Sequence, residues 1–148
     1  PPLRERLSAS GGRIISLFGS AGERDTKKRG EQGHIAATYS DLVILSDEDP
    51  RGEVPMAILE EIAGGINSPQ IKRDETLFLI PDRPTAIRKA FSLAQPGDLV
   101  LLLGKGHENS IIYANETRPY DEISEAESAL AELGYTAVSE HGGARQSQ

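Results

Sequence analysis

The chain has 148 residues, 37% of them hydrophobic and 26% charged, a composition that suits one globular domain with a single core. The formal net charge of −7, together with only 5% aromatic residues and no Trp, argues against nucleic-acid binding. Cysteine is absent, which excludes disulfides and cysteine nucleophiles and fits a cytoplasmic protein. No apolar run is long enough to place the chain in a membrane.

Taken in order, the chain predicts a linker, one domain and a tail. Residues 1–12 are polar, end in Ser and Gly, and are predicted to link the domain to a preceding one that is missing here. Residues 13–140 are predicted to form the domain, and residues 141–148 a disordered tail.

Within the domain, short apolar runs bounded by Gly, Pro and Asp alternate with helical patterns. The predicted strands are 13–18, 42–45, 77–80 and 99–103, a hairpin made of 110–113 and 117–120, and an edge strand at 135–138. The predicted helices are 28–39, 54–66, 85–94 and 124–133.

This alternation favours an α/β fold with short connections. We expect a Rossmann-like, mostly parallel, doubly wound sheet of about six strands, with helices on both faces and a β-hairpin near the C-terminal part. In the first helix, Ile35 and Tyr39 lie four residues apart with Ala36 and Ala37 beside them, a spacing that indicates a helix.

The densest chemistry follows the apolar run at 98–103. Two glycines, a cation, an imidazole and a carboxylate occupy five consecutive positions, Gly104-Lys105-Gly106-His107-Glu108. In open parallel sheets, ligands bind outside the carboxyl ends of the strands, so this pentapeptide predicts a binding site. The alternative is a glycine-capped strand end with solvated charges.

Two other strand ends carry concentrated charge, at 23–29 and 47–51. Carboxyl ends of parallel strands share one edge, so these turns can converge with the pentapeptide across one crevice. The groups suited to a carboxylate are Arg24 and Arg51, and those suited to an ammonium are Glu48, Asp49 and Glu108. Together they complement an amino acid; the alternative is a salt-bridge network without a ligand.

Nucleotide and metal motifs are absent from the sequence. No Gly-x-x-x-x-Gly-Lys-Ser/Thr occurs, so an ATP-dependent enzyme would need its phosphate loop on another domain. Lys27, Lys28 and Arg29 are placed to reach the phosphates of a nucleotide held opposite, and a solvated helix start is the alternative reading. The three histidines lack the spacing of metal ligands, so no metal site is predicted.

Several motifs, in order and spacing, resemble the C-terminal domain of the Mur ligases, and the resemblance covers about residues 13–133. The motifs are Gly22-Glu23-Arg24-Asp25 with Lys28-Arg29, Asp49-Pro50-Arg51, Asp82-Arg83 with Ala86-Ile87, and Gly104-Lys105-Gly106-His107-Glu108. The resemblance implies a ligase of peptidoglycan precursor synthesis that uses ATP and Mg²⁺. In this reaction the amine of a dibasic amino acid, diaminopimelate or lysine, attacks an acyl phosphate of UDP-MurNAc-dipeptide. It also implies that the N-terminal and central domains, which mainly hold the ATP, are missing, and that this chain alone is inactive.

By motif position, the resemblance also implies roles for individual residues. The implied substrate-binding residues are Arg24, Glu48, Asp49, Arg51, Gly104 and Glu108, and those implied to approach the nucleotide are Glu23, Asp25 and Lys28. Arg51 would hold the carboxylate at the side-chain end of diaminopimelate, and Glu108 with the Gly104 carbonyl would hold the amine beside it.

Two departures from the family pattern bear on specificity. The usual Asp-Asn-Pro-Arg is Glu48-Asp49-Pro50-Arg51 here, and an Asp cannot donate to a carboxylate, which leaves lysine and ornithine open beside diaminopimelate. The usual Asp-Asp-Arg after the hairpin is replaced at positions 121–123 by Asp-Glu-Ile. The alternative functions are a folylpolyglutamate-type or other carrier ligase, and a non-catalytic binding module of the same fold.

Overall fold

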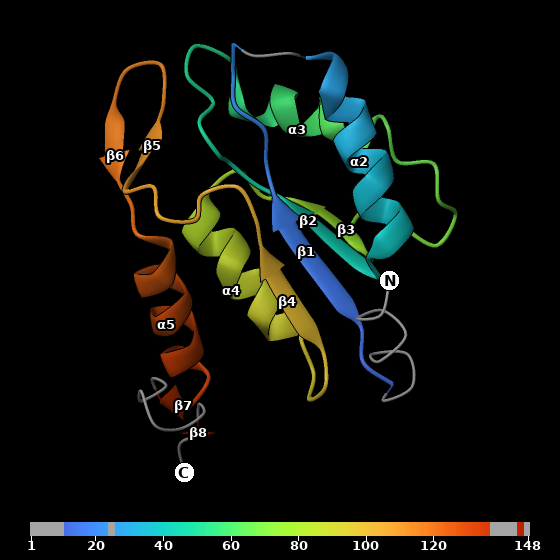
Figure 1. Ribbon diagram of the computed structural model, residues 1–148, viewed down its shortest axis with the longest axis vertical. Helices are drawn as coiled ribbons and strands as arrows, with labels where there is room; N and C mark the ends of the chain where they lie inside the picture. Colours follow the sequence, from blue (N-terminus) through green and yellow to red (C-terminus); the bar gives the residue numbers. More distant parts are fainter. Residues whose placement is uncertain (1–10, 24–25, 137–144, 147–148) are drawn as a thin grey trace.

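A four-stranded parallel sheet forms the centre of the computed structural model, which describes residues 11–23, 26–136 and 145–146 (Figure 1). Its strands, in the spatial order β3-β2-β1-β4, are β3 (Leu77–Leu79), β2 (Leu42–Leu45), β1 (Ile14–Phe18) and β4 (Leu99–Leu102). Every residue of β1 and β2 is buried, which explains why the two strands read as continuous apolar runs rather than alternating patterns.

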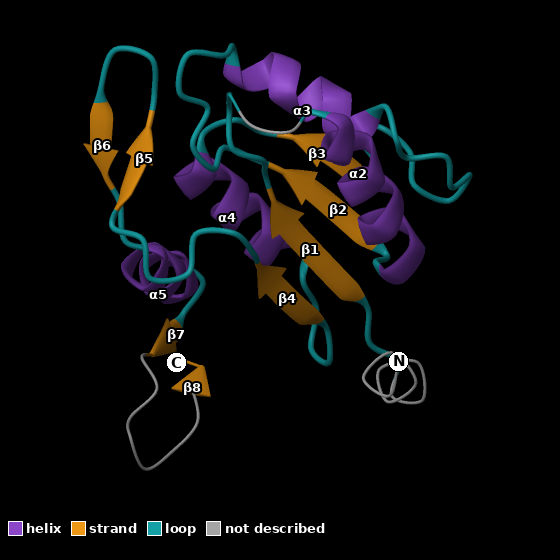
Figure 2. Ribbon diagram, turned by 45° about the horizontal axis from the view of Figure 1, so that its top comes forward, coloured by secondary structure: helices purple, strands orange, loops and turns teal. Residues whose placement is uncertain are grey.

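Helices cover both faces of this sheet (Figure 2). One face packs against α2 (Lys27–Tyr39) and α3 (Pro55–Ala63), and the other against α4 (Arg83–Leu93) and α5 (Glu122–Glu132). Successive residues of β2 serve opposite cores: Val43 packs with the α3 side chains, whereas Ile44 packs with those of α4. The doubly wound α/β class predicted from the sequence is therefore confirmed.

The remaining strands pair outside the central sheet. Strands β5 (Ser110–Ile112) and β6 (Thr117–Pro119) form the predicted antiparallel hairpin, and β7 (Tyr135–Thr136) pairs with β8 (Arg145–Gln146). The sheet itself therefore has four strands rather than about six, because the hairpin strands and β7 find partners elsewhere.

Both ends of the chain fall largely outside the described residues. Of the predicted linker only Gly11 and Gly12 are described, of the predicted edge strand only β7, and of the predicted tail only β8. None of the helices in the described part of the chain is both long and apolar enough to cross a membrane.

The large apolar residues of α2 are exposed rather than buried. Ile35 is 57% exposed and Tyr39 is 49% exposed, and the residues that α2 buries are Arg29, Gly33 and Ala37. The cause is the close approach of α3: a Cβ built on Gly33 would lie 2.0 Å from the Ile62 carbonyl oxygen. Only a side chain of minimal size fits there, so the large apolar residues of α2 lie at its periphery.

Candidate functional site

The loops that follow β1, β2 and β4 meet at one edge of the sheet. The Gly22 N–H donates to the Asp49 carbonyl oxygen at 2.7 Å, which joins the first two loops. The third loop touches the second where Gly104 lies against Glu48, because a Cβ on Gly104 would be 2.8 Å from Glu48 Oε1. The charge-rich turns therefore converge, as the strand order requires for carboxyl ends of parallel strands.

A buried lysine links the two acidic loops. Lys105 is 1% exposed, and its Nζ donates to Asp49 Oδ1 at 2.9 Å and to Glu108 Oε1 at 2.7 Å. Gly104 and Gly106 on either side have φ of 102° and 50°, values that favour glycine, and they let the chain turn Lys105 inward. The Glu108 side chain is 55% exposed, so it can contact a ligand while it balances the lysine.

Asp49, Lys105 and Glu108, with Glu48 and Gly104 beside them, form a charged mouth. Glu48 also lines an apolar groove of about 460 Å³. Its carboxylate is half-buried, and burial is the main cause that raises its pKa, while nearby Lys105 acts in the opposite direction. Glu48 and Gly104 line the groove together with Phe18, Ile35 and Leu103. The exposed apolar side chains of α2, Ile35 and Tyr39, therefore line the groove.

The hairpin holds the far end of the second loop. Arg51 has a left-handed backbone, with φ of 55°, a conformation that costs a non-glycine residue about 1–2 kcal/mol. Its N–H donates to the Ile112 carbonyl oxygen at 2.8 Å, and the Ile112 N–H donates to Asp49 Oδ1 at 2.9 Å. Strand β5 therefore supports the segment that carries both Asp49 and Arg51.

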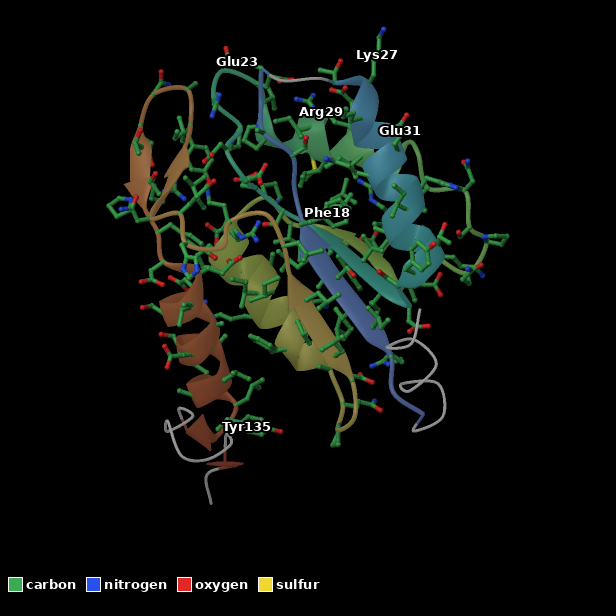
Figure 3. The ribbon with its side chains drawn as sticks, in the orientation of Figure 1. Phe18, Glu23, Lys27, Arg29, Glu31 and Tyr135 are labelled. Carbon is green, nitrogen blue, oxygen red and sulfur yellow. The ribbon has the colours of Figure 1, made fainter. Side chains whose placement is uncertain are left out.

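Arg29 organises the α2 end of the edge (Figure 3). It is fully buried and donates to both oxygens of Glu53, at 3.0 and 2.7 Å, and to Glu61 Oε2 at 3.1 Å. The hydrogen bonds from Arg29, with one from the Glu23 N–H, lower the pKa of Glu53 to about 2. The suggestion that Arg29 reaches a phosphate is therefore wrong, because its guanidinium is paired inside the protein.

The structure brings four of the predicted substrate-binding residues to one mouth: Glu48, Asp49, Gly104 and Glu108. Arg51 follows on the same loop. Of the residues predicted to approach a nucleotide, Glu23 is exposed beside the 52–53 segment and Lys28 is exposed on the first turn of α2. Arg24 and Asp25, also predicted, lie outside the described residues.

Sequence reasoning named Arg83 only as part of a family motif and did not predict that it is buried between these loops. Arg83 donates to the Asp47 carbonyl at 3.0 Å, to the Leu103 carbonyl at 2.9 Å, and to both oxygens of Glu122. Tyr120 also donates its hydroxyl to Glu122. Glu122 stands in the segment that departs from the family pattern, and its burial has no signal in the sequence, because carboxylates are common in the first turn of a helix and Glu125 in the same turn is not buried.

No group of His, Cys, Asp or Glu side chains in the described part of the chain is arranged to hold a metal ion.

Comparisons with known proteins identify the family to which this fold belongs. Residues 3–106 match the family described as "Mur ligase, glutamate ligase domain". A UDP-N-acetylmuramyl-tripeptide synthetase of Treponema denticola is 64% identical over 130 residues, which are 88% of this chain and 24% of that protein. A protein of the same name from Roseiflexus sp. is 58% identical over 124 residues, 84% of this chain and 24% of its own.

Two further relatives have names that specify diaminopimelate. A UDP-N-acetylmuramoyl-L-alanyl-D-glutamate–2,6-diaminopimelate ligase of Clostridioides difficile is 39% identical over 122 residues, 82% of this chain and 24% of that protein. A solved structure of a ligase with this name matches with a TM-score of 0.74 and 30% identity, covering 88% of this chain and 27% of that one. The chain spans about a quarter of the length of these relatives. It belongs to the Mur ligase family and corresponds to the C-terminal, glutamate ligase domain of its members.

Proposed function

We propose that this chain binds the incoming dibasic amino acid for an ATP-dependent ligase that joins it to UDP-MurNAc-dipeptide in peptidoglycan precursor synthesis. The observation that carries the proposal is the mouth where Glu48, Gly104 and Glu108 meet at the carboxyl ends of the strands. The names of the relatives support the reaction, since they are synthetases of UDP-N-acetylmuramyl tripeptides or ligases of diaminopimelate.

The acidic groups suit an ammonium group. Glu108 gives one oxygen to Lys105 and is more than half exposed, which leaves its other oxygen to accept a hydrogen bond from a ligand. Glu48 offers a second carboxylate across Gly104, and its partial burial strengthens its attraction for a cation. Arg51, on the same loop, supplies a guanidinium for a carboxylate of the amino acid.

The charge balance of the mouth ranks the candidate amino acids. Among the described residues, three carboxylates (Glu48, Asp49 and Glu108) face two cations (Lys105 and Arg51), which leaves one negative charge in excess. A side chain that ends in an ammonium group alone complements that excess. The second carboxylate of diaminopimelate would lie near Asp49, so we expect lysine and ornithine to bind more tightly than diaminopimelate.

The nucleotide belongs to the other domains of the proposed ligase. ATP with Mg²⁺ supplies the acyl phosphate that the amine attacks, and its phosphate loop has no counterpart in this sequence. The exposed Lys28, at the N-terminal end of α2, suits an anion approaching from outside this domain; by motif position alone, the proposal includes Glu23 and Asp25 among the residues that approach the nucleotide.

Titration of the isotope-labelled chain with lysine, ornithine, diaminopimelate and glutamate, followed by NMR, tests the proposal. Lysine and ornithine should shift the amide signals of residues 48–51 and 104–108, diaminopimelate should shift them at higher concentration, and glutamate should not. Preferential binding of glutamate would favour the folylpolyglutamate-type alternative. Failure of all four to bind would favour a non-catalytic module.

The Arg51→Ala variant tests the assignment of the guanidinium. Loss of a charge-assisted contact should weaken diaminopimelate binding about tenfold or more, and lysine binding less, since lysine lacks the second carboxylate. Arg73→Ala removes an exposed arginine whose hydrogen bonds join it to Glu60 rather than to residues 48–51 or 104–108, and it should bind like the wild type. Equal losses for both amino acids would remove Arg51 from this role.

A further inference from the structure

The β5–β6 hairpin has no strand pairing to the central sheet; Ile111 packs into the core beside the sheet, and hydrogen bonds join the hairpin to the loop after β2. Its strands pair only with each other among the named strands, and both ribbon views show it standing apart from β4 (Figures 1 and 2). Two of the contacts that join it to the loop use the main chain of Ile112, which meets Asp49 and Arg51. The third is a hydrogen bond between side chains, from the Tyr113 hydroxyl to Asp47 Oδ2 at 2.7 Å.

The main chain of Asp47, in the loop after β2, is held by hydrogen bonds to Pro81 and Arg83. Its N–H donates to the Pro81 carbonyl at 3.0 Å, and its carbonyl accepts from Arg83 at 3.0 Å, so its main chain is held on both sides. Its side chain is buried, Oδ1 has no hydrogen-bond partner, and Oδ2 has Tyr113. An Asp in such surroundings is a costly choice for packing alone, which points to a role for the tyrosine contact.

The side chains of Asp47 and Tyr113 are not among the residues of the charged mouth, and they do not line the groove beside it. They act on residues that are: Asp47 precedes Asp49 by two positions, and Tyr113 follows Ile112, whose main chain holds Asp49 and Arg51. We propose that the Asp47–Tyr113 hydrogen bond positions Asp49 and Arg51 for binding, by seating the hairpin against the loop. The ligand in this inference is the amino acid of the proposed function.

The left-handed backbone of Arg51 makes this support necessary. A non-glycine residue with φ of 55° relaxes toward the right-handed or extended regions when nothing holds it, and the Ile112 carbonyl is what its N–H contacts. A hairpin that detaches therefore releases Arg51 and leaves Asp49 without the Ile112 N–H. Ordering the loop before the ligand arrives increases affinity, because the ligand does not have to order it.

Several groups face the Asp47 carboxylate. They are Tyr113 from the end of β5, Arg118 from β6, and Asp82 and Arg83 from the start of α4. Burial is the main cause that raises the pKa of Asp47 to about 6, and burial also raises the pKa of Tyr113, so that the hydroxyl remains the donor. Protonation of Asp47 below pH 6 removes the charge that strengthens the hydrogen bond.

Tyr113→Phe is the decisive variant. It removes the hydroxyl and keeps the ring, over which the Arg118 guanidinium lies at 4.7 Å. We expect its affinity for lysine, measured by NMR titration of the chain at pH 7.5, to fall about fivefold, the effect of one hydrogen bond. The Arg51 amide should also exchange its hydrogen faster. Tyr135→Phe, at the opposite end of the molecule, is the matched control and should leave both quantities unchanged (Figure 3).

The pH dependence of lysine affinity distinguishes a specific effect of the Asp47–Tyr113 hydrogen bond from a general loss of stability in the variant. Between pH 7.5 and 5 the wild type should lose more affinity for lysine than Tyr113→Phe, because the raised pKa of Glu48 acts alike in both proteins and the Asp47 contact exists only in the wild type. Asp47→Asn keeps an acceptor for the hydroxyl but loses the charge, so at pH 7.5 it should bind lysine more weakly than the wild type and should have the flatter pH profile of Tyr113→Phe.

Two results would overturn the inference: wild-type affinity in Tyr113→Phe, or unchanged exchange of the Arg51 amide. A failure of the proposed function is distinct, since the wild type itself would then bind no lysine while the exchange measurement still reports on the hairpin.

Discussion

Arg29, Arg83 and Lys105 are at most 1% exposed, and each donates hydrogen bonds to at least one carboxylate. These pairs join segments far apart in the sequence: Lys105 meets Asp49 across 56 positions, and Arg83 meets Glu122 across 39. Removing one partner of such a pair leaves a buried charge without compensation, which is strongly destabilising. The buried cations therefore fix the relative placement of the loops at the site.

Single positions in the sequence predicted part of this arrangement. The charges at 48–51 and 104–108 could be placed at one edge, because a buried run followed by glycine marks the end of a parallel strand. The burial of Lys105 and Arg29 could not be predicted, because charged residues in such turns are usually solvated and their partners cannot be recognised in the sequence. The partners, Asp49 and Glu53, belong to another loop.

Asp47→Asn should change the pH dependence of folding stability. Burial raises the pKa of Asp47 from 3.8 to about 6, so this residue contributes stability that is fully present below pH 3.8 and is lost as the pH rises through 6. Asn does not titrate. Relative to this variant, the wild type should therefore lose roughly 3 kcal/mol of unfolding free energy between pH 3.5 and pH 7, measured by urea denaturation. Parallel stability curves for the two proteins would contradict the assigned burial cost.

At the scale of elements, apolar runs and turn residues located the strands and helices to within a few residues. Asp82 and Asp121 accept hydrogen bonds from the N–H of Thr85 and Ser124, so each of the last two helices begins at a capping residue. The buried face of α2 was not predictable from apolar spacing, because the contact with α3 is made by glycines. Hydrophobic periodicity does not detect a helix face that is buried because its side chains are small rather than apolar.

Gly33→Ala should destabilise the α2–α3 contact. The added Cβ would lie 2.0 Å from the Ile62 carbonyl oxygen, a backbone atom that cannot turn aside. Although alanine favours helix by up to about 1 kcal/mol, overpacking should lower the unfolding free energy by about 2 kcal/mol or more. Gly30→Ala is the matched control on the same helix, since its Cβ would lie 3.7 Å from Gly65 Cα, an ordinary contact.

The control should be neutral or stabilising by urea denaturation. If Gly33→Ala matched it, the two helices would be able to separate without cost, and the exposure of Ile35 and Tyr39 would need another cause.

At the scale of the whole molecule, Arg83 joins the carboxyl ends of two strands to the last helix. It contacts the carbonyls of Asp47 after β2 and Leu103 after β4, and its remaining donors hold Glu122 at the start of α5. The small sheet leaves the hairpin and α5 without strand pairing to the core. Arg83 therefore does part of what additional strands do in a larger sheet.

Arg83→Met tests this account of the assembly. The apolar chain of Met fills most of the space, but Glu122 then keeps a buried carboxylate with Tyr120 as its remaining partner, and two carbonyls lose their donor. We expect a loss of about 3–5 kcal/mol in urea denaturation, the range found when one member of a buried ion pair is removed. Arg88→Met, on the same helix, removes a half-exposed arginine that also pairs with α5, through Glu125 and Glu132, and should cost much less. Equal losses from the two variants would show that any arginine between α4 and α5 suffices, and that the ends of β2 and β4 do not depend on Arg83.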